Sequence, residues 1–266
     1  MKLLVLVAAL LLAGLAPALA QRLVTQTATP AAGQPLVLEL KYAHAIRVRP
    51  GTGPGVTVQA RVTIANDELN QSYALVVAQP LDNELRIEEK LDDQLIRRYI
   101  WHEWRDGEGH HGRGDDTALR IDYEVTLPAA TDLTIRTVPA TIDAEGLSGR
   151  VTLKTISGDL NLSNLRGAVL ARTISGSIRL RGLPGTAPVD AITVSGDVDA
   201  NWPPARQAEL SLKSISGEVY ADPTVTFSNL KPRRYVGYEL HGQVAGGSGP
   251  LVSLHTVSGN VFFRQQ

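Results

Sequence analysis

The sequence predicts an all-β protein, with a parallel β-solenoid of the single-stranded β-helix type in its C-terminal part and a sheet- or sandwich-like β region before it. Three observations lead to this fold class. A six-residue pattern recurs along the second half of the chain. Apolar and polar residues alternate with a period of two in the first half, which is typical of half-buried strands. Aromatic residues make up only 5% of the chain, so the core must consist mostly of Val, Leu, Ile and Ala, which suit sheet packing.

The recurring pattern reads Thr, aliphatic, Ser, Gly, polar, aliphatic. Five copies begin at Thr155, Thr173, Thr193, Ser214 and Thr256, the fourth with Ser in place of Thr, and Thr137 to Ile142 form a degenerate first copy. The glycines of the five copies are 18, 20, 21 and then 42 residues apart. Because 42 is twice 21, we expect one rung whose motif is hidden behind a loop around residues 235–250. A step of this size holds two strands and two bends, and such rungs stack into a solenoid.

The second residue of each copy conflicts with strict alternation. Alternation turns Thr and Ser inward and pushes an aliphatic column outward, namely Ile156, Ile174, Val194, Ile215 and Val257. Either the backbone changes parity near the Thr, as a bulge allows, and buries this column, or an apolar stripe is exposed for a partner. We expect the change of parity, because glycine marks bends that need an unusual φ. The Thr and Ser hydroxyls are expected to hydrogen-bond along the stacked rungs.

The N-terminal β region is expected to run from Gln21 to residue 136, and the solenoid from residue 137 to 266. Alternation predicts strands over Val56 to Ile64, over Tyr73 to Val77 and over Leu119 to Leu127, the last ended by Pro128, which lacks an N–H. Residues 91–100 could place Leu91, Leu95, Ile96 and Tyr99 on one helical face, but we predict a strand there. No helix is expected elsewhere in the mature chain.

Residues 1–20 have the pattern of a signal peptide. Lys2 precedes an apolar run from Leu3 to Ala16, and Ala18-Leu19-Ala20 matches the small-residue cleavage rule, so the mature chain is expected to start at Gln21. The run is shorter than the roughly 20 residues that span a bilayer. We therefore expect an exported protein in the periplasm, at the cell surface or outside the cell, without a transmembrane anchor. The chain has no cysteine, which excludes disulfides and a lipoprotein anchor.

The charge balance excludes one class of partner. Lys and Arg number 26 against 27 Asp and Glu, which gives a net charge of −1. Nucleic-acid binding needs concentrated positive charge, so we expect no nucleic-acid partner. No cofactor motif is present in the sequence.

Residues 101–116 hold the residues that most resemble a metal site. His102, His110 and His111 lie among several carboxylates and could bind a divalent cation. Four glycines favour a mobile loop instead, because ordering each residue costs about 1–2 kcal/mol. His102-Glu103 also lacks the second His of a zinc-protease motif. We therefore predict no dedicated metal site, and we expect Trp101 and Trp104 to cap a sheet edge rather than to stack on a sugar.

The repeated serines do not indicate catalysis. Ser157, Ser175, Ser195, Ser216 and Ser258 occupy equivalent places, whereas a nucleophile is a single residue with its own base. None lies in a G-x-S-x-G motif. We predict a structural role for the pattern and no catalytic residue.

The chain resembles a known family of secreted bacterial proteins labelled "putative adhesins", built on domain of unknown function 4097. The resemblance rests on the tandem copies of the pattern and on the strand from Tyr123 to Pro128 that leads to Leu133-Thr134-Ile135. It covers residues 118–266 well and the N-terminal part weakly. It implies a β-helix-like fold behind a signal peptide, and it carries over no catalytic or binding residue.

The sequence therefore favours a non-enzymatic envelope or surface protein that presents a binding face to a protein or glycan. The alternative is a polysaccharide-active β-helix enzyme, which would need carboxylates or a basic cluster converging on one sheet. The rung faces instead carry scattered Lys154, Arg172 and Lys213.

Overall fold

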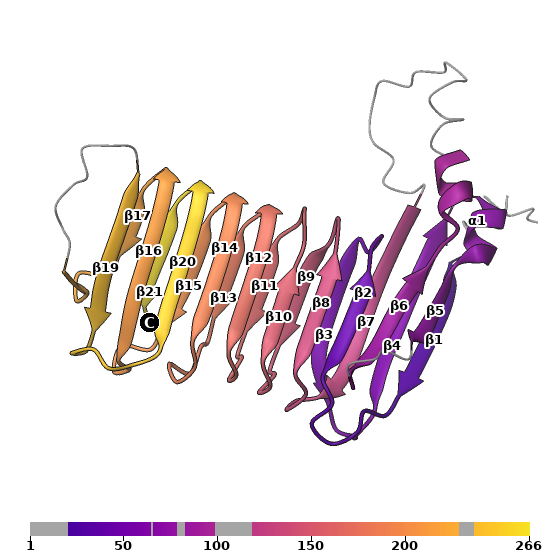
Figure 1. The fold of residues 1–266 in the computed structure, drawn as a ribbon, viewed down its shortest axis with the longest axis horizontal. Coiled ribbons are helices and arrows are strands. Elements are labelled where there is room, and N and C mark those ends of the chain that lie inside the picture. Colours follow the sequence, from indigo (N-terminus) through magenta and orange to yellow (C-terminus); the bar gives the residue numbers. More distant parts are fainter. Residues whose placement is uncertain (1–20, 65, 79–82, 99–118, 229–236) are drawn as a thin grey trace, which may run out of the picture.

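The computed structural model describes residues 21–64, 66–78, 83–98, 119–228 and 237–266. The expected signal peptide, residues 1–20, and the segment 101–116 with its histidines and tryptophans lie outside the described residues. The described chain forms two long sheets that lie against each other, with strands stacked from one end of the molecule to the other (Figure 1). The predicted all-β fold with parallel solenoid rungs is confirmed.

One sheet has eleven strands and carries the first half of each rung. Its order in space is β5 (Ala74–Ala78), β6 (Leu85–Lys90), β2 (Leu36–Leu40), β8 (Leu133–Thr137), β10 (Val151–Lys154), β12 (Val169–Ser175), β14 (Val189–Ser195), β20 (Leu251–Ser258), β16 (Ala208–Ser216), β19 (Tyr238–Val244) and β18 (Thr226–Phe227).

The other sheet has ten strands and carries the second half of each rung. Its order is β1 (Arg22–Ala28), β4 (Val56–Ile64), β7 (Leu119–Pro128), β3 (Ala45–Gly51), β9 (Thr141–Glu145), β11 (Leu160–Ser163), β13 (Ile178–Arg181), β15 (Val198–Trp202), β21 (Val261–Gln265) and β17 (Val219–Ala221).

The core lies between the two sheets and follows from the alternation within each rung. In β10, Val151 and Leu153 are buried, and in β11 of the same rung Leu160 and Leu162 are buried opposite them. Parallel pairing without a register shift aligns each inward residue with its equivalent in the next rung, for example Val151 with Val169. The bends after β9, β11 and β13 add a second repeat that the sequence analysis did not single out, with a buried leucine at each bend: Leu147, Leu165 and Leu183.

Strands from both sides of residue 136 belong to the same two sheets. β2 pairs in parallel with β8, and β3 pairs in parallel with β9, so the N-terminal region continues the stack. The outermost strands at this end pair antiparallel, β1 with β4, β4 with β7 and β5 with β6. The three strands predicted in this region correspond to β4, β5 and β7.

Two short helices at the N-terminal end were not expected. Helix α1 (Asp67–Ser72) begins after Asn66, whose side chain accepts a hydrogen bond from the Leu69 N–H. Residues 93–98 are also helical, so the strand predicted over 91–100 is wrong. The Asp92 carboxylate accepts from the backbone N–H of Gln94 and Leu95, which caps this helix. Within the described ranges, no helix has the length and apolar character needed to cross a bilayer.

The last rung in the sequence is not the last rung in space. β20 lies between β14 and β16, and β21 lies between β15 and β17. The predicted hidden rung in the 42-residue step is therefore wrong. The step instead contains β18 and β19, and β19 pairs antiparallel with β16, which lets the chain turn back and insert its C-terminal rung.

Glycine is required at each T-x-S-G bend for two reasons. Gly158, Gly176, Gly196 and Gly259 have φ between 127° and 144°, a region that L side chains rarely adopt. A Cβ on Gly196 would also collide with the backbone carbonyl of Gly176 in the neighbouring rung. The bends therefore stack glycine on glycine, and the prediction that glycine marks bends with an unusual φ is confirmed.

Gly196→Val is expected to destabilise the protein by several kcal/mol, because the new side chain strains φ and pushes two rungs apart. Gly53→Val is the matched control, since a Cβ at Gly53 meets nothing within 4 Å and its φ is not in the strained region. Urea unfolding of both variants measures the difference. Equal midpoints for the two variants would show that the bend glycines do not set the stacking.

Candidate functional site

The aliphatic column of the repeat is exposed. Ile156, Ile174, Val194, Val257 and Ile215 expose between 40% and 52% of their surface, and Val138 of the degenerate copy exposes 38%. The expected change of parity near the Thr is therefore wrong, because alternation continues through the aliphatic residue. We call these six side chains the aliphatic stripe; they lie on adjacent rungs at one border of the eleven-stranded sheet's outer face.

The threonine before each stripe residue explains why the stripe faces outward. Thr193 is fully buried, and its hydroxyl donates to the Gly176 carbonyl of the preceding rung at 2.9 Å. Thr256 makes the same bond to Gly196 at 2.9 Å, and Ser214 makes it to Gly259 at 2.8 Å. A residue held inward by this bond forces its successor in an extended strand to point outward. The predicted hydroxyl ladder is confirmed for the first position of the motif.

The serine of each motif behaves differently from the threonine. Ser157, Ser175 and Ser195 are exposed, whereas strict alternation had placed them inward. Among the hydrogen bonds of the described residues, the hydroxyls of these three serines have no partner. The bend begins at the serine, which is why alternation ends there. The predicted serine part of the ladder is therefore wrong.

A row of mostly basic residues borders the stripe on the face of the eleven-stranded sheet, two positions before each stripe residue: Arg136, Lys154, Arg172, Ile192, His255 and Lys213. We call these residues the basic row. Arg136 pairs with Glu39, Arg172 with Asp190 at 3.4 Å and Lys213 with Glu239 at 3.5 Å. Lys154 forms no ion pair with any described residue. Burial lowers the pKa of His255, which therefore adds little positive charge near neutral pH.

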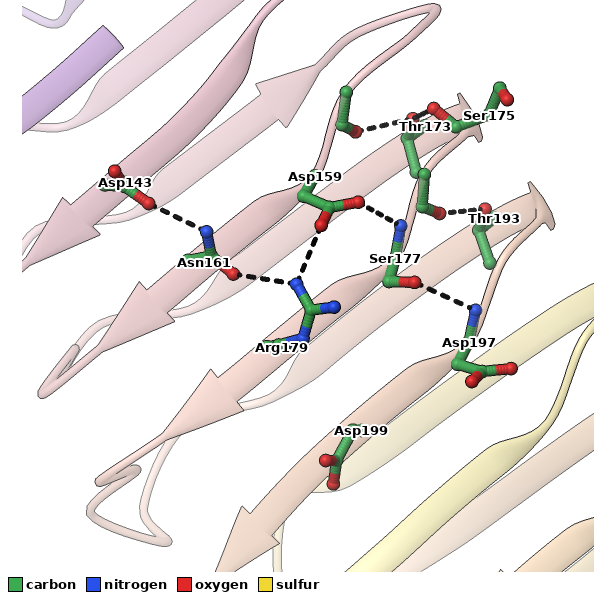
Figure 2. A network of polar contacts seen from close by, with 12 residues as sticks. Asp143, Asp159, Asn161, Thr173, Ser175, Ser177, Arg179, Thr193, Asp197 and Asp199 are labelled. Carbon is green, nitrogen blue, oxygen red and sulfur yellow. Dashed lines mark hydrogen bonds and ion pairs between the residues drawn. The ribbon is translucent and has the colours of Figure 1, made fainter. Parts of the chain in front are cut away.

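A polar ladder borders the stripe on the other side, beyond the bend. The side chain after the glycine accepts a hydrogen bond from the backbone N–H of the equivalent residue in the next rung. Figure 2 shows the bonds that Asp159 accepts from Ser177 at 2.8 Å and Ser177 from Asp197 at 3.3 Å. The ladder continues with Asp197, which accepts from Asn260 at 2.7 Å, and Asn260, which accepts from Glu218 at 3.0 Å. These residues differ in chemistry but share an acceptor oxygen, so the position has a structural role.

The carboxylates on the ten-stranded sheet are held by arginines. Arg179 contacts Asp159 at 2.8 Å and Asn161 at 3.3 Å, and Asn161 donates to Asp143 at 2.8 Å (Figure 2). Burial alone would raise the pKa of Asp159, but the Arg179 guanidinium and the Ser177 N–H outweigh it and hold this pKa below its ordinary value. Asp159 therefore remains ionised at neutral pH and is suited to an ion pair rather than to proton transfer.

A buried polar group lies at the N-terminal end of the stack. Glu89 accepts from the Tyr42 N–H at 2.8 Å, and the Tyr73 and Tyr123 hydroxyls are 2.8 Å apart. Burial raises the pKa of Glu89 to about 7, although the Tyr42 hydrogen bond partly offsets it. No sequence pattern marks this group, because Glu88-Glu89-Lys90 is typical of a solvated strand end.

The described residues contain no group of three or more His, Asp or Glu placed to hold a metal ion. His102, His110 and His111, the residues considered as metal ligands, lie outside them.

Comparison with protein families assigns the fold. A family model described as Toastrack DUF4097 matches residues 108–262, more than half of the chain. The chain belongs to the Toastrack DUF4097 family. This agrees with the resemblance drawn from the repeated T-[IV]-S-G copies, and no curated protein matches the chain.

Solved structures with low sequence identity resemble this Toastrack chain. A "putative cell adhesion protein" from Clostridium sporogenes is 10% identical, covers 93% of this chain and 100% of its own, and has a TM-score of 0.48. A "putative adhesin" from Bacteroides fragilis is 12% identical, covers 93% of this chain and 99% of its own, and has a TM-score of 0.46.

Removing the hydroxyl of the buried threonine should destabilise this Toastrack chain more than removing the hydroxyl of the exposed serine. Thr193→Val should lower the free energy of unfolding by about 1 kcal/mol, because the Gly176 carbonyl loses its partner. Ser195→Ala should change it by less than about 0.5 kcal/mol, because the side chain is exposed. Equilibrium unfolding measures both. The reverse order would contradict the assigned roles.

Glu89 should make stability depend on pH. Burial raises its pKa from the ordinary value of 4.5 to about 7 in the folded chain, so the folded state holds an extra proton between these values. The contribution to stability is complete below about pH 4.5 and is lost as the pH rises from there through 7. Glu89→Gln should remove this fall, on the order of 3 kcal/mol.

The control for this variant is Glu88→Gln, because Glu88 pairs with Lys90 instead of lying in the buried group. Unfolding by urea at several pH values between 4.5 and 8 compares both variants with the wild type. A pH profile that is unchanged by Glu89→Gln, or one that is flattened equally by Glu88→Gln, would assign the dependence to other groups.

Proposed function

We propose that this Toastrack chain is a non-enzymatic, adhesin-type binding scaffold, exported to the cell envelope or surface, and that the aliphatic stripe is its binding face. The observation that carries the proposal is the exposure of six aliphatic side chains in register on adjacent rungs. Neighbouring strands lie about 4.8 Å apart, so the stripe is about 24 Å long.

Packing does not account for the stripe. Its residues point away from the core, and the outward positions before and after them are mostly polar. A polar residue at these positions would leave the buried threonine and the bend glycine in place. Contiguous apolar patches of a few hundred Å² on a soluble protein mark interaction sites. The repetition of Ile or Val in every copy therefore supports a role in binding.

The export part of the proposal rests on the sequence. Residues 1–20 match the signal-peptide pattern, with a positive residue, an apolar run and a small-residue cleavage site. The binding part rests on the exposed stripe. The names of the structural neighbours mention adhesion, but they describe those proteins and carry no argument about this chain.

A polysaccharide-active enzyme is the competing hypothesis. It needs carboxylates that are free to act as acid and base, one of them with a raised pKa. Asp159 instead pairs with Arg179, and Asp199 pairs with Arg181 and Arg264. Both carboxylates are thus engaged by arginines instead of being free, and the one carboxylate described above with a raised pKa, Glu89, lies in the tyrosine group at the N-terminal end of the stack, which favours the scaffold.

The double variant Ile174→Asp, Val194→Asp should reduce binding of the purified protein to cells of the producing organism by about tenfold or more, because burying two charges in an apolar contact costs more than about 1.4 kcal/mol. Ser163→Asp is the control, since Ser163 lies on the ten-stranded sheet. The fluorescence bound to cells is measured for the labelled wild type, the double variant and the control, after their melting temperatures have been shown to be equal.

Equal binding by the double variant and the wild type would show that the stripe is not the binding face. Ser195→Ala and Ser175→Ala should leave this binding unchanged. Release of soluble sugars from envelope polysaccharide by the wild type, lost in Ser195→Ala at unchanged melting temperature, would favour the enzyme hypothesis.

A further inference from the structure

We propose that two copies of this chain exchange their C-terminal rung, residues 251–266, and so form an intertwined dimer. In this dimer β20 and β21 of each copy fill the slot of the other copy, which is the gap between β14 and β16 in one sheet and between β15 and β17 in the other. The turn at residues 245–250 is the hinge. The proposal goes beyond the proposed function and does not depend on the aliphatic stripe.

The C-terminal rung is inserted between strands that precede it in the chain (Figure 1). β20 pairs in parallel with β14 on one side and with β16 on the other, and β21 lies in the same way between β15 and β17. Its inward side chains Val252, Leu254, Val261 and Phe263 are buried. Because one segment at the end of the chain makes all these contacts, the same segment of a second copy makes them equally well.

The turn at residues 245–250 joins this rung to β19. β19 and β20 lie on opposite sides of β16, so the turn crosses over the start of β16. The crossing is close, since a Cβ on Gly249 would lie 2.0 Å from the Gln207 carbonyl oxygen. Six residues reach about 20 Å when they are extended, which is enough to lead the rung into an adjacent copy instead.

The backbone of this turn is strained. Ala245 and Ser248 have φ of 52° and 69°, in the left-handed region that disfavours a side chain, and the two glycines between them have φ of 90° and 80°. The hydrogen bond from the Gly247 N–H to the Val244 carbonyl is long, at 3.3 Å. An extended hinge relieves the strain, and short hinges under strain favour the exchange of the segment that they carry.

The turn that leads into β16 is less suited to be the hinge, because it is anchored to the core. The indole N–H of the buried Trp202 donates to the Arg206 carbonyl at 3.1 Å, and the Arg206 N–H donates to the Pro203 carbonyl at 3.1 Å. All of residues 203–207 are described, and none of them has a positive φ. We therefore place the exchange after β19, so that residues 208–250 remain with their own copy.

A disulfide between β16 and β20 tests the exchange, because the chain has no cysteine of its own. Ser211 and Ser253 are register partners on these strands, so Ser211→Cys, Ser253→Cys places two thiols within reach of a disulfide. This variant of the mature chain, residues 21–266, is held in partly denaturing urea at high concentration, returned to buffer, separated by size and oxidised. The dimer fraction should be covalently linked on a non-reducing gel, because each disulfide joins β16 of one copy to β20 of the other.

Two results would overturn the proposal. A dimer whose disulfides are all intramolecular would show that β20 stays beside β16 of its own copy. A wild type that remains monomeric after the same treatment at every concentration would show that no exchange occurs. A monomer of the cysteine variant that is oxidised before the urea step should form no dimer, because its rung is locked in place; dimerisation of this locked monomer would indicate a surface contact instead.

Variants of the hinge give a second test. Deletion of Gly246 and Gly247 should raise the dimer fraction by about fivefold or more, because the shortened turn is strained further in crossing β16. Ala245→Gly, Ser248→Gly should lower the dimer fraction by a similar factor, because glycine adopts a positive φ without strain. Asn164→Gly is the matched control, since Asn164 has a φ of 54° in the bend after β11, and it should leave the fraction unchanged. Equal dimer fractions in all these variants would contradict the role of the hinge.

Discussion

The hydrogen bond from the first side chain of each motif to a backbone carbonyl of the neighbouring rung holds the stack together at its bends. The acceptor is a glycine in four of the five copies, and it is Val138 for Thr155. Thr193 donates to Gly176, Thr256 to Gly196 and Ser214 to Gly259. The same glycines sit so close to the next rung that a Cβ would collide with its backbone. The hydroxyl and the missing Cβ therefore act together, one drawing the rungs into register and the other allowing them to approach.

This contact fixes the outer surface as well as the core. The buried threonine determines that the next residue faces water, and the glycine determines that the chain turns directly afterwards. The polar residue after the glycine then accepts a hydrogen bond from the next rung, as Asp159 does from Ser177. A single bend geometry thus produces an apolar stripe and an acceptor ladder on its two sides, and repetition extends both along the molecule.

Local sequence patterns predicted the parts of the fold that local geometry determines. The strands β4 and β7 and the glycine bends all follow from alternation and spacing. The prediction for the orientation of the stripe is wrong, because the bend that the glycine marks starts only at the serine, after the aliphatic residue, and therefore does not change the direction of that side chain. The serine was misplaced because no local signal marks whether the bend starts before or after it.

Features that depend on long-range contacts could not be predicted from the sequence. The insertion of β20 between β14 and β16 depends on pairing between segments far apart in the chain, and a repeat spacing of 42 residues fits a hidden rung equally well. The helix over residues 93–98 depends on the cap at Asp92 in a short segment without clear periodicity. The buried Glu89 depends on tyrosines from three different places in the chain.

The inserted C-terminal rung has a consequence for biosynthesis. A chain that grows from its N-terminus can stack rungs in order as far as β14 and β15, but β16 cannot join them, because the place beside β14 belongs to a strand that has not yet been made. Assembly is completed only when residues 251–266 emerge. Without residues 251–265, β14 and β16 have no strand between them in one sheet, and β15 and β17 have none between them in the other, so this segment decides whether the rungs form one continuous structure.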